Sequence, residues 1–532
     1  MKKNCILFLL DSLTFDTINS AETSSILFPN LYKLSSKFKF KKCVANSNCT
    51  QFVLPSLFSM TMPLDEGGYD YGVKNRHVTI MEILKKEGFK TLIFSNCNQM
   101  GADNGYDRGV DENINSFDYR LILEQKLNRV ILNKYKKNNQ NLEKDKNLIL
   151  DYKNLLIEVK KKIDNSDTLI WSDKLKKINF GISKNVTKEL ELIELEPNII
   201  LKKLLTINPA SIWRFLGVYN LKDTKFLFIR LLTSFNWRLK YMITKSILPI
   251  NILGHSTINI IDKFDKFKNK VRELDKPFFL YHHIMDLHDY ENFNSFNFFI
   301  KKISKFSKWY KNTKNLKRKR KFLYDATLML IDDYVGKVIE SIDKDTCLFI
   351  TSDHGHRKSL KKQIPRFYFD NDKFNEMHGE DIEVPIISNI NFENIEKDKK
   401  LFDTISFSKT IMDILDINIS GYIQKNNQEG QLIISEHSGR GSFDLRKNLY
   451  FTVSGLKSRM LLSILNNEIF FKFYNIINDP DEINDISQDE NYKEEIKFFF
   501  DFLLRNRKNI LSSKLKSIKK LHNTFIKENY EL

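Results

Sequence analysis

A short apolar run that leads into an acid and a histidine constrains this chain more than any other feature. Cys347-Leu348-Phe349-Ile350 is uniformly apolar, as expected for a strand buried on both faces of a parallel sheet. Asp353-His354-Gly355 follows two residues later. Open α/β sheets bind ligands at the carboxyl ends of such strands. A carboxylate and an imidazole there can bind a divalent metal, although a strand followed by a polar turn has the same residue types.

Length and composition fit a large globular protein. The chain has 532 residues, of which 42% are hydrophobic and 29% charged, enough for one large α/β domain with insertions or for two domains. Its net charge of +18 favours anionic partners, such as phosphorylated or sulfated substrates, nucleic acid or an anionic membrane surface. Charge alone does not choose among these partners.

Cysteine usage and hydropathy bear on the compartment. The five Cys residues are odd in number and scattered, which argues against a disulfide framework and for a reducing compartment, although Cys43 and Cys49 could pair. The apolar run at Ile6–Leu10 is too short for a signal peptide and is expected to be the first strand. Because no segment has the ~18 uncharged apolar residues of a membrane span, we expect a cytoplasmic protein, with peripheral contact at the inner membrane face as an option.

Alternating strand and helix patterns predict a central, mostly parallel sheet flanked by helices. A capping box, Thr79-Ile80-Met81-Glu82, marks the start of one of these helices. The expected strands of the sheet are 5–10, 91–94, 277–281, 347–350 and 384–388, and later helices are expected over 322–342 and 405–416. Short strands at 449–452 and 468–473 predict a smaller C-terminal sheet.

Composition shifts along the chain divide it into five parts. Residues 120–275 are rich in Lys, Asn, Leu and Ile with helical spacing, which predicts a helical insertion. The parts are the first section of a catalytic domain (1–119), a helical basic insertion (120–260), the second section of the catalytic domain (261–425), a small C-terminal α+β subdomain (426–490) and a basic helical tail (491–532).

Two basic stretches suggest contacts with anionic partners. Residues 198–253 mix bulky apolar groups with cations, which is typical of a helical subdomain packed on the main domain or of an amphipathic surface on an anionic membrane. Residues 301–321 carry eleven Lys or Arg and no acid. Such a run is usually a solvated face or a loop, and nucleic-acid binding there would rest on charge alone, so we expect no specific nucleic-acid partner.

Several polar residues follow predicted strands or open a predicted helix. Asp11 ends the first strand, and His288 follows the strand at 277–281. Thr50 precedes the hydroxyl-rich turn Pro55–Ser59, and His378-Gly379 lies beyond Asp353. A hydroxyl near a helix N-terminus and a metal can ionise and attack, because positive potential stabilises the alkoxide. Taken singly, each of these residues is more often a cap or a hydrogen-bonded turn residue.

Together, and in this order, the motifs resemble the sulfatase-like branch of the alkaline phosphatase superfamily. This resemblance covers nearly the whole chain outside 120–260 and implies an α/β fold with an alkaline-phosphatase-like central sheet. The stretches that carry it are Asp11 after the first strand, Gly88-Phe89-Lys90-Thr91, Tyr106–Asp111, Lys276–Leu280 leading to His288, Ser352-Asp353-His354-Gly355, His378-Gly379 followed by Val384-Pro385, and Tyr474–Glu482.

The chain departs from the sulfatase pattern at the nucleophile. Formylglycine-type sulfatases carry Cys or Ser, then any residue, then Pro-Ser-Arg, whereas this chain has Val53-Leu54-Pro55-Ser56-Leu57. The stretch is more similar to phosphoethanolamine transferases, which have a nucleophilic Thr five residues before a Pro. Thr50 stands five residues before Pro55, so this resemblance implies that Thr50 is the nucleophile and a metal ligand. Ser47, Ser56 or an inactive site are the alternatives.

The resemblance also implies a mechanism. Asp11, Thr50, Asp353 and His354 would hold a divalent metal; a mixed oxygen and imidazole shell favours Zn or Mn, and Mg and Ca are also compatible. His288 and His378 would stabilise anionic oxygens or protonate the leaving group. The expected enzyme is a metal-dependent hydrolase or transferase that acts on an anionic phosphoester, or sulfoester, substrate. A true sulfuric ester hydrolase and a decayed binding protein on the same scaffold are the alternatives.

Four polar residues near these motifs are weaker candidates for the site. His283 follows a buried strand, and His356 follows the Asp353 motif. Asp16 is expected to cap a helix, and Glu436-His437 is expected to form a turn. The transferases' membrane anchor and disulfides are missing from this chain, so their substrate cannot be carried over.

Overall fold

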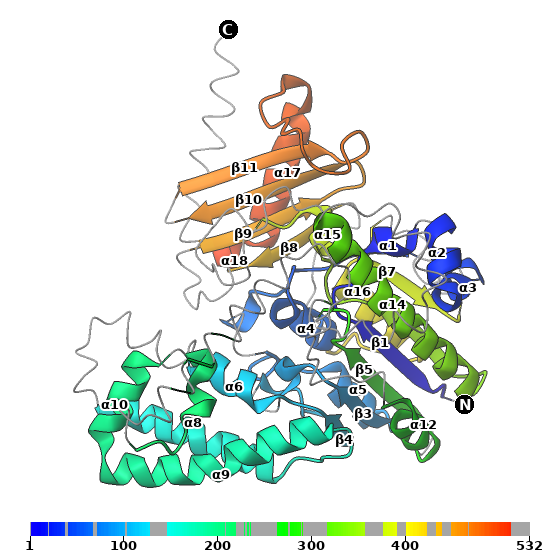
Figure 1. The fold of residues 1–532 in the computed structure, drawn as a ribbon. Helices are drawn as coiled ribbons and strands as arrows, with labels where there is room; N and C mark the ends of the chain where they lie inside the picture. The colour runs from blue at the N-terminus through cyan, green and yellow to red at the C-terminus, as the bar shows by residue number, and fades with distance from the viewer. Residues whose placement is uncertain are drawn as a thin grey trace.

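The computed structural model describes residues 2–19, 21–37, 41–67, 72–101, 104–127, 146–207, 209–219, 228, 231–232, 235, 263–274, 277–288, 290, 316–356, 376–390, 401–422, 432–438, 448–465 and 468–511. They form a central sheet covered by helices, a helical insertion and a small C-terminal sheet (Figure 1). The predicted α/β architecture is thereby confirmed.

The central sheet has the order β2-β7-β6-β1-β5-β3-β4. Its strands are β1 (Cys5–Leu10), β2 (Lys41–Val44), β3 (Lys90–Ser95), β4 (Glu112–Asn115), β5 (Phe278–Ile284), β6 (Cys347–Thr351) and β7 (Glu383–Ser388). The β6-β1-β5-β3-β4 section is parallel, whereas β7 pairs antiparallel with both β6 and β2. The sheet is therefore mixed but mostly parallel, with one reversed strand, β7, between β6 and the edge strand β2.

Strand β1 shows why the sheet is covered on both faces. All six of its residues are buried, and successive side chains point to opposite faces. Leu7 and Leu9 join the larger hydrophobic core, while Ile6, Phe8 and Leu10 join the second one. A strand in this position must be apolar throughout, as the sequence pattern predicted.

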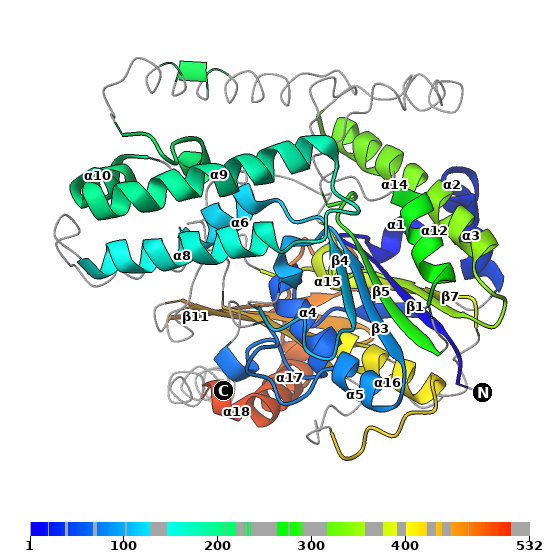
Figure 2. The same ribbon diagram turned by 90° about the horizontal axis from the view of Figure 1, so that it is seen from below.

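Helices pack on each face of the sheet (Figure 2). On one side lie α1 (Phe15–Asn19), α2 (Ala21–Leu27), α3 (Pro29–Lys37), α12 (Phe264–Arg272) and α14 (Leu316–Ser341). On the other lie α4 (Thr50–Ser59), α5 (Ile80–Lys86) and α16 (Thr404–Ile414). The predicted capping box is confirmed, because Thr79 accepts a hydrogen bond from the Glu82 amide and the Glu82 carboxylate accepts one from the Thr79 amide.

The insertion is helical where the structure describes it. Its elements are α6 (Tyr119–Lys126), α8 (Lys146–Asp164), α9 (Asp173–Leu195), α10 (Pro197–Thr206) and the 3-10 segment η6 (Pro209–Arg214). Within them a fully buried ion pair joins Lys203 Nζ to Glu189 Oε2 at 2.6 Å. Ile212 and Phe215, from the stretch considered for membrane contact, are buried in the larger core, so this part of 198–253 packs on its neighbours.

The C-terminal part forms a second sheet. Its antiparallel strands, in the order β11-β10-β9-β8, are β8 (Ile433–His437), β9 (Asn448–Ser454), β10 (Ser458–Leu465) and β11 (Glu468–Asn475), and the helices α17 (Lys493–Asn506) and α18 (Lys508–Leu511) follow. The expectation of a turn at Glu436-His437 is wrong, because both residues lie buried in β8. Arg507 forms an ion pair with Glu436 inside this part and a second one with Asp65 in the N-terminal part of the chain.

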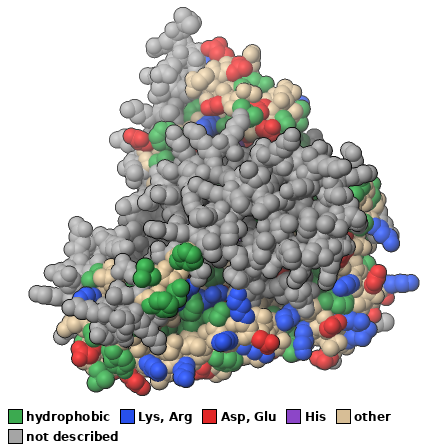
Figure 3. Space-filling view, in the orientation of Figure 1, with side chains coloured by type: hydrophobic (Ala, Val, Ile, Leu, Met, Phe, Trp, Pro, Cys, Tyr) green, Lys and Arg blue, Asp and Glu red, His purple; other side chains and the backbone are tan. Residues whose placement is uncertain are grey.

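Surface charge and cysteines add little to the choice of partner. Figure 3 shows Lys and Arg side chains interspersed with acidic ones over the described surface of that face. The basic run at 301–321 lies outside the described residues except for its last six, which belong to α14.

All five Cys residues are buried and unbridged, Cys43 and Cys49 among them. None of the helices in the described ranges combines the length and hydropathy of a membrane span.

Candidate active site and metal centre

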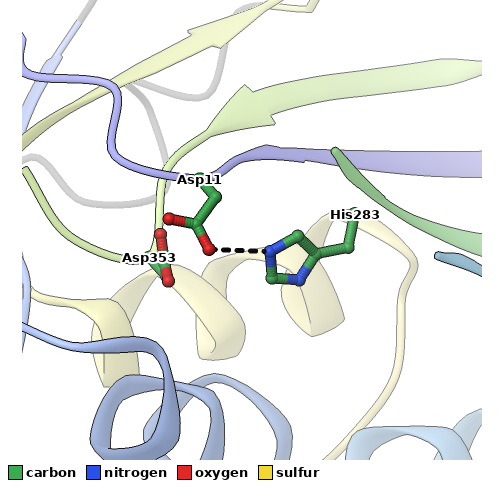
Figure 4. Close-up of side chains that lie close together, drawn as sticks. All are labelled: Asp11, His283 and Asp353. Atoms are coloured by element: carbon green, nitrogen blue, oxygen red, sulfur yellow. Dashed lines mark hydrogen bonds and ion pairs between the residues drawn. The ribbon is translucent and has the colours of Figure 1, made fainter. Parts of the chain in front are cut away.

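Three neighbouring strands bring two acids and a histidine together. Asp11 follows β1, Asp353 follows β6, and His283 lies near the end of β5. Because β6, β1 and β5 are adjacent and parallel, their carboxyl ends meet at one edge of the sheet. One ligand atom from each of these residues lies within 4.8 Å of the others, and all three side chains are 0% exposed (Figure 4).

The backbone after β1 is shaped to hold this cluster. Ser12 has a positive φ of 69°, a conformation that a non-glycine residue rarely adopts outside functional turns. Its amide lies 3.4 Å from Asp353 Oδ1, and its hydroxyl donates to Asp11 Oδ1 at 2.9 Å. Ser352 Oγ lies 2.7 Å from the Leu10 carbonyl and accepts from the Leu13 amide, so it fastens the end of β6 to the end of β1.

Thr50 reaches the cluster from helix α4. It is the first residue of α4, and Cys49 precedes it in an extended conformation. The Thr50 hydroxyl donates to Asp11 Oδ2 at 3.1 Å and lies 3.4 Å from His354 Nε2. A hydroxyl at this position has the positive end of the helix dipole next to it, which favours the ionised form.

His354 presents one defined nitrogen to the site. Its Nδ1 lies 2.7 Å from the carbonyl oxygen of Gly355, which can only accept, so Nδ1 carries the proton. In the neutral ring, Nε2 then bears a lone pair. Nε2 lies 3.4 Å from Asp353 Oδ2 and 3.8 Å from Asp11 Oδ1, so the structure brings together all four predicted metal ligands, Asp11, Thr50, Asp353 and His354.

Electrostatics keep Asp11 ionised. Burial by itself raises the pKa of this carboxyl, but His288, the hydrogen bond from His283 and the charge of His354 together hold it far below its usual range. Burial lowers the pKa of His283, yet the neighbouring Cys97 sulfur and the Asp11 carboxylate raise it to about 10. The centre therefore consists of negative carboxylates surrounded by imidazoles.

One orphaned oxygen shows that the residues fit a divalent metal. Asp353 Oδ2 is buried and, among the described residues, accepts no hydrogen bond. Leaving a carboxylate oxygen in this state is costly unless a cation occupies the site. Two carboxylates, two imidazoles and a hydroxyl also match the donor set that Zn and Mn accept.

His288 lies beside the cluster on the loop after β5. Its charge acts directly on Asp11, and its side chain is half-buried. The loop is held by Asn96, whose side-chain oxygen accepts from the Met285 amide at 2.8 Å and whose amide group donates to Asp286 Oδ2 at 3.1 Å. This clamp was not predicted, because Asn96 lies far away in the sequence on the neighbouring strand.

His378 precedes the short helix α15 (Gly379–Ile382), which packs on Gly355 in the loop after β6. The Gly355 amide donates to the Asp381 carbonyl at 2.8 Å, and a Cβ on Gly355 would lie 2.1 Å from the Glu380 carbonyl oxygen. Only glycine allows this approach. The ring of His378 itself contacts Glu482 and Glu376.

The structure adds one residue to the predicted cluster. His283, which the sequence marked only as a weaker candidate, contacts Asp11 with Nε2 at 3.3 Å and Tyr281 with Nδ1 at 2.9 Å. His356 stacks on Tyr324 and lies 3.2 Å from the Tyr290 hydroxyl. His437 lies in β8, stacked on Tyr450. Asp16 lies in the first turn of α1.

Comparison with known proteins places this geometry in a family. The sequence profile described as Sulfatase matches residues 3–417. A search of curated proteins found no match. Among solved structures, the phosphonate monoester hydrolase of Agrobacterium radiobacter has a TM-score of 0.50 at 10% identity, with 96% of each chain covered. Ps i-CgsB in complex with k-i-k-neocarrahexaose has a TM-score of 0.47 at 14% identity, covering 95% of this chain and 92% of its own.

The profile spans most of the chain and includes the strands that carry Asp11, His283 and Asp353. The likeness to the phosphonate monoester hydrolase, at 10% identity, shows a common fold and nothing finer. The chain therefore belongs to the sulfatase family and is an ester hydrolase of that family.

Proposed function

We propose that the protein cleaves or transfers phosphoester groups with the Thr50 hydroxyl as nucleophile. One observation carries the proposal: the Thr50 hydroxyl lies at the start of α4 and donates to Asp11 Oδ2, within 3.4 Å of His354 Nε2. No other hydroxyl that we considered combines these features. Ser47 and Ser56 are buried, and among the described residues their hydroxyls contact no polar partner.

The packing of Val53 favours phosphorus over sulfur. Val53 occupies the position that would be Cys or Ser in a formylglycine-type sulfatase, and it is fully buried in a hydrophobic cluster. Leu57 replaces the family's Arg and is buried in the larger core. Because this chain cannot form formylglycine at Val53, Thr50 and a phosphoester substrate give the more consistent mechanism, similar to that of phosphoethanolamine transferases.

The side chains divide the reaction between them. Asp11, Thr50, Asp353 and His354 would hold the divalent ion, which when bound lowers the pKa of a coordinated hydroxyl and stabilises negative charge. The Thr50 hydroxyl releases its proton to water and its oxygen attacks phosphorus, so that a new Oγ1–P bond forms as the bond to the leaving oxygen breaks. His288 and His378 would donate protons to anionic or leaving oxygens. Water or an acceptor hydroxyl then cleaves the phosphothreonine ester.

A direct assay tests the proposal. The purified protein is stripped of metal, reloaded with Mn, Zn, Mg or Ca, and offered aryl phosphate, aryl phosphodiester and aryl sulfate. We expect metal-dependent cleavage of a phosphorus ester that Thr50→Ala abolishes and Ser56→Ala, the matched change on the same helix, retains. Cleavage of the sulfate alone would overturn the choice of phosphorus, and activity retained in Thr50→Ala would overturn the nucleophile.

If none of the three esters is cleaved, a second experiment distinguishes a transferase from an inactive protein. A strict transferase would still become phosphorylated at Thr50 when given a suitable donor, which intact-protein and peptide mass spectrometry would detect. Tight metal binding without a covalent adduct or turnover would instead support the alternative of a decayed, binding-only scaffold.

A further inference from the structure

Glu482 lies in a tight turn after β11, far in the sequence from the catalytic strands. Its backbone is left-handed, with φ of 51°, and its amide donates to the Asp479 carbonyl. Asp479 Oδ2 in turn accepts from the amides of Ile483 and Asn484. The turn holds the Glu482 side chain inward, where the residue is only 5% exposed. A buried acid in a strained, well-bonded turn calls for a specific partner.

That partner is the imidazole of His378. Glu482 Oε2 lies 2.6 Å from His378 Nδ1, and Glu482 Oε1 accepts from the Gly379 amide at 2.9 Å. A Cβ on Gly379 would lie 2.5 Å from Arg459 Nη1 and 3.1 Å from Glu482 Oε1, so a larger residue would break the contact. The Glu482 carboxylate thus contacts both the His378 ring and the Gly379 backbone amide.

Arg459 fixes Glu482 from behind. Its guanidinium pairs with Glu482 and with Glu383, and its Nε donates to Ser454 Oγ at 3.1 Å, although the residue is only 2% exposed. Burial raises the pKa of Glu482, but Arg459 and His378 lower it to about 2, so the carboxylate is ionised at neutral pH. A fixed, charged acceptor of this kind sets the tautomer of the imidazole that it contacts.

The other side of the ring is also charged. Glu376 Oε2 lies 3.5 Å from His378 Nε2, and Lys472 binds both oxygens of Glu376 at 2.8 and 2.9 Å. The ring centroids of Tyr474 and His378 are 6.0 Å apart. The Asp381 carboxylate accepts a hydrogen bond from the His378 amide. The two ring nitrogens of His378 therefore face different carboxylates, Nδ1 facing Glu482 and Nε2 facing Glu376.

We propose that Glu482 is a positioning residue that acts through His378. It holds the proton on Nδ1 and stabilises the imidazolium, whose Nε2–H can then donate to an anionic or leaving oxygen. This inference rests on the proposed function for its catalytic consequence, whereas the orientation of His378 can be measured independently of turnover.

A double-mutant cycle tests the catalytic consequence. We expect Glu482→Gln to lower kcat by at least about tenfold, the loss typical when a carboxylate partner of a functional histidine is removed. Asp481→Asn, on the exposed neighbouring residue, should leave kcat unchanged. In a His378→Gln background, Glu482→Gln should cause no further loss. Equal losses of kcat in both backgrounds would show a structural role only and would overturn the inference.

Nitrogen NMR of histidine-labelled protein tests the orientation without any substrate. The His378 signals are identified by their absence in His378→Gln. We expect a protonated Nδ1 in the wild type and in Asp481→Asn, and a changed protonation pattern in Glu482→Gln, with melting temperatures recorded to confirm folding. A bare Nδ1 in the wild type would overturn the inference. A protonated Nδ1 in a protein without ester turnover would instead indicate that the proposed function is wrong while Glu482 still positions His378.

Discussion

His282 and His283 are consecutive residues of β5 that lie on opposite faces of the central sheet. His282 stacks on Phe267 at 4.9 Å between ring centroids, and its two nitrogens contact the Phe94 carbonyl and the Tyr334 hydroxyl. His283 instead contacts Asp11 in the metal cluster. Two identical side chains therefore have opposite roles, one structural and neutral, the other electrostatic and part of the site.

The buried ring of His282 should make the fold sensitive to mild acid. Burial lowers the pKa of His282 to about 3, from an ordinary value near 6.5, although the Phe94 carbonyl opposes the shift. Below pH 6.5 the unfolded chain binds a proton at this residue that the folded chain does not bind until about pH 3. Stability from His282 is therefore present above pH 6.5 and declines as the pH falls through that window.

Urea unfolding from pH 7.5 to pH 4 checks this prediction. The wild type should lose more stability across the window than a His282→Gln variant, which cannot take up the proton. The His437→Gln variant is the control, because it removes another fully buried histidine, on a different sheet. It shows whether the loss of any buried imidazole changes the pH dependence of stability in the same way. If wild type and His282→Gln lose stability in parallel, the neutral role of His282 is wrong.

His283 is expected to support metal binding. Its Nε2 is 3.3 Å from Asp11 Oδ2 and within reach of the same site as Asp353. Replacing it in His283→Gln should weaken metal affinity by about tenfold to a hundredfold, as is typical for ligands or their direct partners. Titration calorimetry with Mn and Zn measures the change. Affinity equal to that of the wild type would exclude His283 from the metal site.

The Asp353 carboxylate is expected to bind the metal and to lower the stability of the metal-free fold. Its Oδ2 is buried close to the Asp11 carboxylate and accepts no hydrogen bond from the part of the chain that the structure describes. Asp353→Asn removes one of two neighbouring buried carboxylate charges, so we expect the metal-free variant to melt at a higher temperature than the metal-free wild type. Added metal should then raise the melting temperature of the wild type and not that of the variant.

Melting temperatures of the wild type and Asp353→Asn, measured in chelator and in excess metal, test this prediction. Asp325→Asn, a buried acid on α14, serves as the matched control because α14 packs on the sheet and Asp325 lies outside the metal cluster. Equal stabilisation of the wild type and Asp353→Asn by metal would contradict the assignment.

Part of the segment 198–253 should contact an anionic membrane. Phe228, Leu231, Leu232 and Phe235 have helical spacing and are 61%, 69%, 46% and 64% exposed, and residues 225–245 contain only basic charges. We expect the protein to float with anionic vesicles and not with zwitterionic ones, and Phe228→Ser combined with Leu231→Ser to abolish flotation. Leu195→Ser, on an exposed apolar residue of α9, is the control. Flotation of the double variant would disprove this contact.

Local sequence determined most of the catalytic scaffold. The apolar runs of β1 and β6 could only be strands buried on both faces, and polar residues directly after them had to lie at the carboxyl edge of the sheet. Asp11, Asp353 and His354 could be placed from this rule. Thr50 was selected only through the resemblance to the transferases, and the expected turn at Pro55–Ser59 is wrong, because those residues form the second half of α4. The Thr79 capping box marked α5.

Tertiary structure decided which side chains join the site. In β5 the alternation of side chains is certain from sequence, but which of His282 and His283 faces Asp11 depends on how β5 pairs with β1, where Leu9 lies opposite His283. The acid that holds His378 is 104 residues away, in a turn whose inward side chain only packing against Arg459 can fix. Strand and cap signals are short-range and can be read in the sequence, whereas pairings between distant segments are set by the packing of the whole fold.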